Sequence, residues 1–180
     1  MLICCVIALL FCITGNAKVP YIPKIINYSV SDYKAGNQNW AVSQGPGGKM
    51  YIGNNRGLLV FDGIHWDLVK LPNNLGVRAL YISKDGRIYV GSFEEFGYFE
   101  MDDENDLIYH SLSSSEMNVY LNNDEFWTIN EYKGEIYFQS FRSFFIYDGE
   151  KVRKGVSDLS PLYSCSIKLL SFRQDFSLPV

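Results

Sequence analysis

Between residues 39 and 72 the chain alternates between apolar runs and short polar breaks. The apolar runs are Trp40–Gln44, Met50–Ile52, Gly57–Phe61 and Trp66–Leu71. The breaks are residues 45–48, 54–56 and 62–63, rich in the Asn, Asp and Gly that tolerate the positive φ of tight hairpins. Because the runs are rich in Tyr, Ile, Val, Phe and Trp, which suit a pleated surface, we expect a four-stranded antiparallel meander.

This unit recurs twice further along the chain. Gly-Lys-Met-Tyr-Ile-Gly (48–53) returns as Gly-Arg-Ile-Tyr-Val-Gly (86–91) and as Gly-Glu-Ile-Tyr-Phe-Gln (134–139). Leu-Val-Phe-Asp-Gly (59–63) returns as Phe-Ile-Tyr-Asp-Gly (145–149), and more weakly as Gly-Tyr-Phe-Glu-Met-Asp (97–102). The spacing is 38 residues from Gly48 to Gly86 and 48 from Gly86 to Gly134. Four strands in a repeat of about 40 residues are typical of β-propeller blades.

The predicted strands are apolar on both faces, which favours blades packed between neighbours over an isolated β-sandwich. We therefore predict an all-β fold of three four-stranded antiparallel blades, at residues 39–72, 77–121 and 126–154. Since closed propellers typically need four to eight blades, we expect an incomplete, open arc with two uncovered blade faces. Tyr51, Tyr89 and Tyr137 hold the same place in the three repeats and should be buried between sheets.

The first 14 residues form a continuous apolar run, too short for a comfortable membrane span of about 20 residues. Small residues follow at Gly15 and Ala17, as a signal peptidase requires, although no Lys or Arg precedes the run. The pattern predicts a signal peptide (1–17) cleaved after Ala17, and hence an extracytoplasmic protein. The alternatives are a start codon placed a few residues late, or a buried strand or helix.

The segments on either side of the repeats are less regular. In the lead-in segment, residues 18–38, Pro20 and Pro23 favour extended backbone, and Ile25–Val30 is predicted to form a strand. Residues 155–180 are Ser-rich and lack the repeat pattern where a fourth blade should start. We expect this aberrant tail to come from a shifted reading frame or a truncated gene.

Composition excludes several functions. The net charge of -4, without a basic stripe, speaks against a nucleic-acid surface. Three of the four cysteines, Cys4, Cys5 and Cys12, lie in the predicted signal peptide, and Cys165 is alone beyond it. A mature chain with one cysteine can carry neither a disulfide framework nor a Cys-rich metal site.

The sequence shows no catalytic pattern. His65 and His110 are the only histidines and lack evident partners for a metal or catalytic site. Asp102–Asp106 lacks the Gly and Glu that a calcium loop needs at its sixth and twelfth positions, so we expect a solvated hairpin turn. Residues 113–115 (Ser-Ser-Ser) should be a linker, since neither a nucleophile motif nor a phosphate-binding glycine loop is present. We expect a binding protein without cofactor or metal, and not an enzyme.

The loops after the second strand of each blade should project from one common rim. Their candidate ligand-binding residues are Asn54, Asn55, Arg56, Phe93, Glu94, Glu95 and Arg142. Arginine, aromatic and carboxylate side chains on a concave rim can hold a polar ligand such as a sugar. The alternative is that these are hairpin loops that bind nothing.

Several of these motifs resemble the two-component-regulator propeller repeat of bacterial periplasmic sensors. The closest match is Tyr51-Ile52-Gly53 followed by Gly-Leu-Leu-Val-Phe-Asp-Gly (57–63) and Trp66. Tyr89-Val90-Gly91 matches the first part, and Tyr137-Phe138 with Tyr147-Asp148-Gly149 matches in part. Residues 35–40 and 93–99 resemble the subtype joined to a triple-tyrosine domain, and the whole resemblance covers about residues 20–154.

This resemblance implies the truncated N-terminal sensor region of a transmembrane regulator anchored in the inner membrane. Such proteins continue through a membrane helix to a helix-turn-helix regulator or a histidine kinase, and often serve polysaccharide use. The implied partners are a carbohydrate or other small ligand, and the missing blades and triple-tyrosine domain of the parent sensor. No nucleic acid is expected to contact this segment. The alternatives are a propeller enzyme of lyase or quinoprotein type, or a propeller scaffold for protein partners.

Overall fold

The computed structural model of the protein describes residues 23–114 and 117–155. In this part of the chain, twelve strands form three four-stranded antiparallel sheets, and each strand pairs with the next one along the chain. The first sheet comprises β1 (Asn39–Gln44), β2 (Met50–Asn54), β3 (Gly57–Phe61) and β4 (Trp66–Val69). The second comprises β5 (Ala79–Ile82), β6 (Ile88–Gly91), β7 (Phe96–Met101) and β8 (Leu107–Ser111). The third comprises β9 (Phe126–Tyr132), β10 (Glu135–Ser140), β11 (Phe144–Tyr147) and β12 (Val152–Lys154). The predicted blade fold is confirmed.

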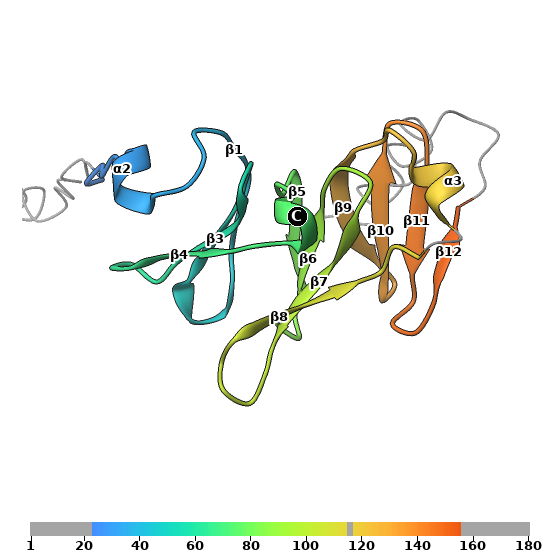
Figure 1. Ribbon diagram of the computed structural model, residues 1–180. Coiled ribbons are helices and arrows are strands. Elements are labelled where there is room, and N and C mark those ends of the chain that lie inside the picture. Colours follow the sequence, from blue (N-terminus) through green and yellow to red (C-terminus); the bar gives the residue numbers. More distant parts are fainter. Residues whose placement is uncertain (1–22, 115–116, 156–180) are drawn as a thin grey trace, which may run out of the picture.

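The three sheets stand side by side in chain order, as Figure 1 shows. The described residues also contain two short α-helices, α2 (Val30–Tyr33) and α3 (Asn118–Leu121), and two 3-10 turns, η2 (Pro46–Gly48) and η3 (Pro72–Asn74). Among these elements, no helix has the length and apolar character needed to cross a membrane. The predicted signal peptide and all of the predicted tail after Gly155 lie outside the described residues.

The strand predicted at Ile25–Val30 is wrong, because residues 25–29 have no regular secondary structure and α2 begins at Val30. Ser29 and Asp32 form a capping box, in which the Ser29 backbone N–H donates to Asp32 Oδ2 at 2.6 Å. A capping box satisfies the free N–H groups at a helix start, so it favours one helical turn over a strand at this point.

Successive residues of each strand face opposite neighbours, and this alternation packs the sheets together. Between the first and second sheets, Tyr51, Leu58 and Val60 of one meet Ile88 and Val90 of the other. Between the second and third sheets the packing is mostly aromatic, with the Phe96 ring 4.7 Å from those of Phe126 and Phe138. Each interface is therefore a packed, largely apolar core between two blades.

The three repeated tyrosines are all buried, with exposed fractions of 3% for Tyr51, 4% for Tyr89 and 9% for Tyr137, but only the first two lie between described sheets, as predicted. Tyr51 lies in the core between the first two sheets, and Tyr89 in the core between the second and third. Tyr137 lies in a separate cluster with Phe144 and Ile146. The described residues contain no further sheet on that side.

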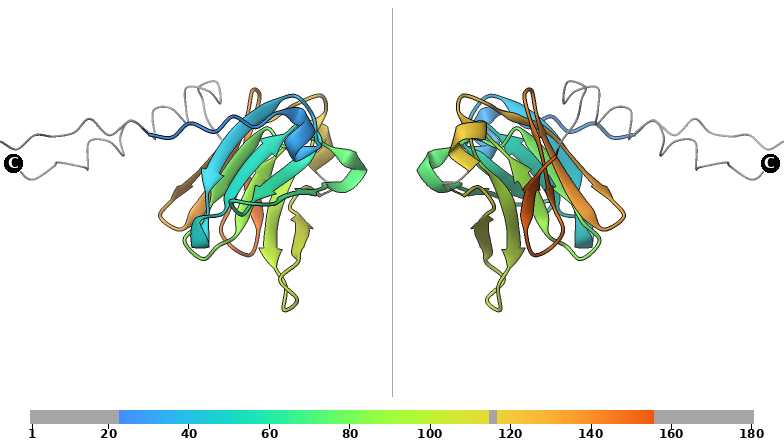
Figure 2. Two further views of the ribbon diagram at one scale, coloured as in Figure 1. Left: turned by 90° about the vertical axis from the view of Figure 1, so that its left-hand side faces the viewer. Right: turned by 90° about the vertical axis from the view of Figure 1, so that its right-hand side faces the viewer.

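The sheets form an open row, which Figure 2 views from its two ends. The expectation that both end faces are uncovered is wrong for the first sheet. Its outer face is covered by the lead-in segment, whose Tyr28 ring lies 5.1 Å from that of Phe61 and 5.3 Å from that of Trp66. The Tyr33 ring packs on the same Trp66 at 5.6 Å. The apolar outer face of the first sheet therefore packs against the lead-in segment.

One aspartate follows the third strand of every sheet and closes the turn to the fourth strand. Asp62, Asp102 and Asp148 each accept hydrogen bonds from two turn N–H groups, at 2.6–2.9 Å. This is the local side-chain capping that favours Asp in turns. The acidic stretch Asp102–Asp106 is thus a solvated hairpin turn, as its sequence predicts.

Candidate functional site

One edge of the molecule carries the loops that the sequence places on a common rim. The pairings Asn39 with Asn54, Ala79 with Gly91 and Phe126 with Ser140 put the start of each first strand beside the end of the second. We call this edge the upper rim, since it lies at the top of Figure 1. It consists of loops 54–56, 92–95 and 140–142 with the beginnings of β1, β5 and β9.

In the first loop, Asn54 is fully buried and its side chain is used within the protein. Its Oδ1 accepts from the N–H groups of Gly36 and Arg56, both at 3.0 Å, and its Nδ2 donates to Gly36 O at 2.8 Å and to Asn39 Oδ1 at 2.7 Å. Asn55 is half-buried and Arg56 is exposed. Asn54 therefore fastens the loop to the lead-in segment, and Arg56 is the residue presented to solvent.

In the second loop, the two carboxylates are engaged internally. Glu95 accepts hydrogen bonds from the hydroxyl groups of Tyr109, at 2.8 Å, and of Ser111 and Ser113, both at 2.7 Å. Burial, together with the charge of Glu95, raises the pKa of Tyr109, so this hydroxyl stays a donor. Glu94 accepts from the Asn123 backbone N–H.

Two other residues of these loops face outward. Phe93 is 39% exposed. Arg142 is exposed and its Nη1 lies 3.5 Å from the Asn122 carbonyl oxygen. Its neighbour Phe141 is 54% exposed and packs on Trp127 with ring centroids 5.5 Å apart. The upper rim thus exposes aromatic rings beside arginine side chains.

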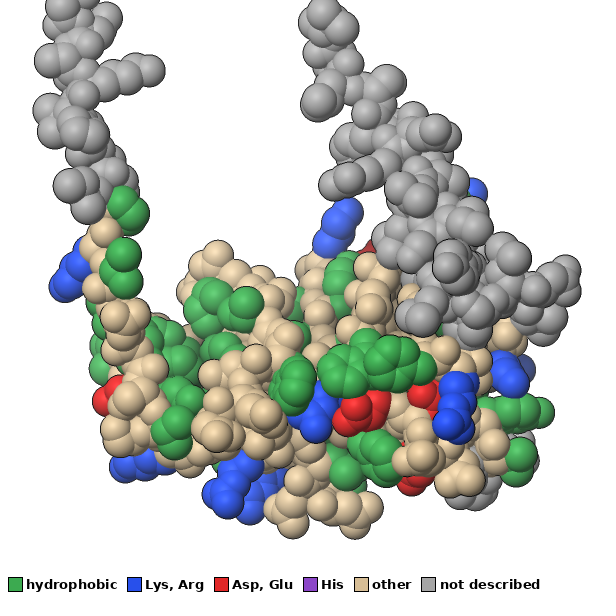
Figure 3. All heavy atoms as spheres, turned by 90° about the horizontal axis from the view of Figure 1, so that it is seen from above, with side chains coloured by type: hydrophobic (Ala, Val, Ile, Leu, Met, Phe, Trp, Pro, Cys, Tyr) green, Lys and Arg blue, Asp and Glu red, His purple; other side chains and the backbone are tan. Residues whose placement is uncertain are grey.

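Four residues that the sequence reasoning missed lie together at the inner edge of this rim. We call Trp40, Arg78, Glu125 and Trp127 the inner-strand cluster. The Arg78 guanidinium carbon lies 4.3 Å from the centroid of the Trp40 ring, and Arg78 Nε donates to Glu125 Oε1 at 3.0 Å. The Trp40 and Trp127 rings meet edge to face at 5.8 Å. Figure 3 views this rim from above, with hydrophobic, basic and acidic side chains adjoining near its centre.

Three of these residues hold one structural position. Gly53, Gly91 and Gln139 are equivalent positions of the repeat, and their partners on the first strands are Ala41, Ala79 and Thr128. The residues that directly precede these partners are Trp40, Arg78 and Trp127, which are therefore equivalent too. In the first and third sheets the pairing register shifts at the tryptophan, so both residues sit in β-bulges. Bulges re-aim side chains and are common beside functional sites. Aligning the first strands of the repeats would have revealed this column.

The cluster contains hydrogen-bond donors without acceptors. Arg78 Nη1 and Trp127 Nε1 are buried and have no partner among the described residues. Buried polar atoms are rarely left unpaired, so such atoms need an explanation. A bound ligand or water can provide the missing acceptors.

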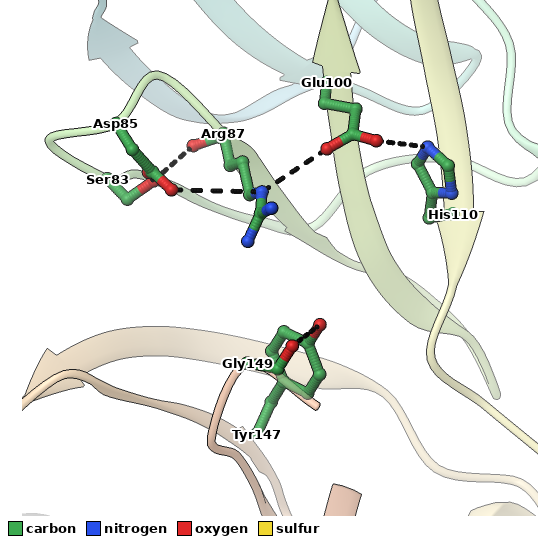
Figure 4. A network of polar contacts seen from close by, with 7 residues as sticks. All are labelled: Ser83, Asp85, Arg87, Glu100, His110, Tyr147 and Gly149. Atoms are coloured by element: carbon green, nitrogen blue, oxygen red, sulfur yellow. Dashed lines mark hydrogen bonds and ion pairs between the residues drawn. The ribbon is translucent and has the colours of Figure 1, made fainter. Parts of the chain in front are cut away.

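A second polar network lies at the lower edge, between the second and third sheets (Figure 4). Arg87 Nε lies 3.8 Å from Asp85 Oδ2 and 3.4 Å from Glu100 Oε2, and Glu100 Oε1 lies 3.0 Å from His110 Nε2. The His110 ring stacks on Tyr98 at 5.0 Å. The side chains of this network therefore satisfy one another.

No group of three or more His, Cys, Asp or Glu side chains in the described residues could hold a metal ion. His65 is exposed, with Nδ1 3.3 Å from Asp62 Oδ2, and lies in the β3–β4 turn of the first sheet, whereas His110 lies on β8 of the second. Hollows adjoin both the upper rim and the second polar network. One of about 640 Å³ adjoins Glu94 and α3 on the upper rim, and one of about 670 Å³ lies between the first two sheets, beside Lys49 and Arg87.

Comparison with solved structures identifies the architecture. The extracellular domain of the proposed one-component system BT4673 from B. thetaiotaomicron is similar, with 12% identity and a TM-score of 0.60 over 75% of this chain and 19% of that chain. The extracellular domain of the proposed hybrid two-component system BT3049 from the same organism has 20% identity and a TM-score of 0.51, over 75% and 18%. Virginiamycin B lyase from Staphylococcus aureus has 17% identity and a TM-score of 0.52, over 71% and 45%. The sheets are propeller blades.

The chain thus spans about a fifth of the length of the two regulator domains. No protein-family model matches the chain, and no curated protein sequence is significantly similar to it. At these identities the similarity establishes the shared fold, which is the one expected for the sensor region of a two-component regulator.

Proposed function

We propose that this chain is part of the extracytoplasmic, ligand-sensing propeller of a bacterial signal-transduction and transcription regulator. The proposal is supported by the regulator repeats in its sequence and by the extracellular regulator domains among its structural neighbours. Its partners are then a carbohydrate or another small polar ligand, and the remaining blades and triple-tyrosine domain of the parent sensor.

The observation that carries the ligand proposal is the alignment of Trp40, Arg78 and Trp127 at the inner edge of the upper rim. Indole rings offer flat apolar surfaces on which the C–H face of a sugar ring can stack. The Arg78 and Glu125 side chains beside them can hydrogen-bond sugar hydroxyl groups. Together these groups can hold a sugar by stacking and hydrogen bonds.

The predicted rim residues then have two kinds of role. Arg56, Phe93 and Arg142 are exposed and extend the surface around the cluster. Asn54, Glu94 and Glu95 support the loops through the hydrogen bonds that their side chains accept. The backbone N–H of Asn55 donates to the Gln38 carbonyl oxygen at 3.1 Å.

Binding of soluble oligosaccharides to the purified full chain tests this function. Intrinsic tryptophan fluorescence and calorimetry should detect at least one glycan, and Trp40→Ala and Trp127→Ala should each weaken its binding. His65→Ala, in an exposed lower turn, is the matched control and should bind as the unmodified chain does. Failure of every glycan to bind, or full binding by both tryptophan variants, contradicts the proposal.

The lyase among the neighbours supports a second candidate, a propeller enzyme. Against it, His65 and His110 stand apart, each beside a single carboxylate. The two functions differ in one measurement. A lyase converts its ligand to products detectable by mass spectrometry, whereas a sensor returns the ligand unchanged.

A further inference from the structure

The Arg78 side chain occupies the middle of the inner-strand cluster and is held from two sides. Its guanidinium group lies against the Trp40 ring, 4.3 Å from the centroid to the central carbon. Its Nε donates to Glu125 Oε1 at 3.0 Å, and the Arg78 and Glu125 side chains are only 23% and 24% exposed. These two contacts fix the orientation of the guanidinium group.

The ion pair with Glu125 leaves part of the guanidinium unused. Glu125 contacts Nε, whereas Nη1 is buried and has no acceptor. Arginine presents its donors in a planar fork that matches two coplanar oxygens, as in a carboxylate. The free donor therefore calls for an acceptor that comes from outside the described chain.

The other unpartnered buried atom of the cluster is of the same kind. Trp127 Nε1 is a donor, and Trp127 contacts the same Trp40 ring that Arg78 covers. The unpartnered Asn130 Nδ2 is also a donor, but Asn130 pairs with Tyr137, on the outer face of the third sheet. The fourth unpartnered buried atom, Asn55 Oδ1, is an acceptor, but it is tucked under the β2–β3 loop against Gly36. An ionised carboxylate only accepts hydrogen bonds, whereas a sugar hydroxyl also donates. The donors of the cluster therefore match a carboxylate better than a hydroxyl.

We propose that Arg78 binds a carboxylate of the ligand, so that the sugars recognised at this site are uronic acids. This inference rests on the proposed carbohydrate-binding function and narrows it to acidic saccharides. The indole rings of Trp40 and Trp127 contact the face of the uronate ring, and the Arg78 fork takes its carboxylate at the edge.

Matched acidic and neutral probes test the inference on the purified full chain. The acidic probes are short galacturonate and glucuronate oligosaccharides, and the neutral probes are the same compounds with their carboxylates reduced to alcohols. Because charge-assisted hydrogen bonds are about twice as strong as neutral ones, the acidic form should bind at least about tenfold more tightly. This preference should weaken with added salt.

Variants of Arg78 separate specific from general charge effects. Arg78→Gln should abolish the preference for the acidic probe, so that the acidic and neutral probes bind this variant with equal affinity. Arg78→Lys keeps the charge but lacks the planar fork, so it should retain part of the preference. Lys84→Gln removes one positive charge from an exposed turn of the same blade and should change nothing. Unchanged circular dichroism and melting of each variant show that the blades remain folded.

The outcomes distinguish this inference from the function on which it rests. Equal binding of acidic and neutral probes, or an acidic preference that survives in Arg78→Gln, overturns the uronate inference and leaves carbohydrate binding standing. Absence of binding to every glycan overturns both.

Discussion

Trp40 of the first blade and Trp127 of the third blade touch each other across the inner edge of the second, with ring centroids 5.8 Å apart and ring planes at 75°. Edge-to-face contact of this kind stabilises a protein beyond the area that the rings bury. The contact joins two blades that share no strand pairing in the described chain. It therefore fixes the spacing of the blades around the upper rim.

The first prediction is that the two tryptophans are energetically coupled. A double-mutant cycle with Trp40→Ala, Trp127→Ala and the double variant should give an interaction of about 0.5–1.5 kcal/mol, measured by denaturant unfolding. Pairing Trp40→Ala with Trp66→Ala is the control. Trp66 packs on the outer face of the first sheet, so this second cycle should give additive effects. Additivity in the first cycle would show that the cross-blade contact does not form in solution.

The second prediction concerns the core between the second and third blades. Tyr89 contacts the rings of Tyr81, Tyr98, Phe138 and Tyr147 and is 4% exposed. Truncation to Ala should lower the free energy of unfolding by about 3–5 kcal/mol, because it leaves a cavity in a packed aromatic core.

The matched control for Tyr89→Ala is Val119→Ala, at a side chain that is 83% exposed. This change should stay within about 0.5 kcal/mol. Similar small effects for both variants would mean that the two blades do not pack through Tyr89.

The third prediction is that Asn54 anchors the lead-in segment. Asn54→Asp keeps the shape of the side chain but replaces its two N–H donors by an oxygen facing Gly36 O and Asn39 Oδ1. The loss should cost about 1–3 kcal/mol of stability, and amide exchange should accelerate from Ser29 to Gly36. Exchange that speeds up equally in all three blades would instead indicate a general loss of stability.

The strands were predictable because a turn closed by an aspartate follows the third strand in each repeat. The Asp62, Asp102 and Asp148 side chains accept hydrogen bonds from nearby N–H groups. Such contacts lie within four residues and leave a mark in the sequence. The alternation of apolar side chains between neighbouring cores is equally local. Both features could be inferred without knowing how the blades are placed.

The features that the sequence did not predict depend on contacts between residues that are far apart in the sequence. The sequence places Asn54 in an exposed loop, but its side chain is hydrogen-bonded to the backbone of Gly36, 18 positions earlier. The cluster of Trp40, Arg78 and Trp127 combines one side chain from each blade. The two tryptophans lie in β-bulges, which cannot be predicted from the residue types at these positions. The strand expected over Ile25–Val30 does not form, because residues 25–29 are irregular and the Ser29–Asp32 capping box starts α2 at Val30.

The fourth prediction concerns export. If residues 1–17 are a signal peptide, protein recovered from the periplasm should begin with Lys-Val-Pro-Tyr, starting at Lys18. N-terminal sequencing or mass spectrometry of the exported chain measures this directly. Periplasmic protein with Met1 intact would contradict a cleaved signal, and Ala17→Leu should block cleavage if the site is placed correctly.

The fifth prediction follows from the electrostatics of the β3–β4 turn. The backbone N–H groups of His65 and Ile64 donate to the Asp62 carboxylate and lower its pKa from 3.8 to about 2. Because the folded-state pKa is lower than the unfolded one, the ionised carboxylate stabilises the turn fully above about pH 4. That contribution is lost as the pH falls toward about 2. An NMR titration of the Asp62 carboxyl carbon should therefore give a midpoint near 2. His65→Ala should leave it low, since the backbone donors remain, and a midpoint near 3.8 in either protein would show that the turn is not closed by this aspartate.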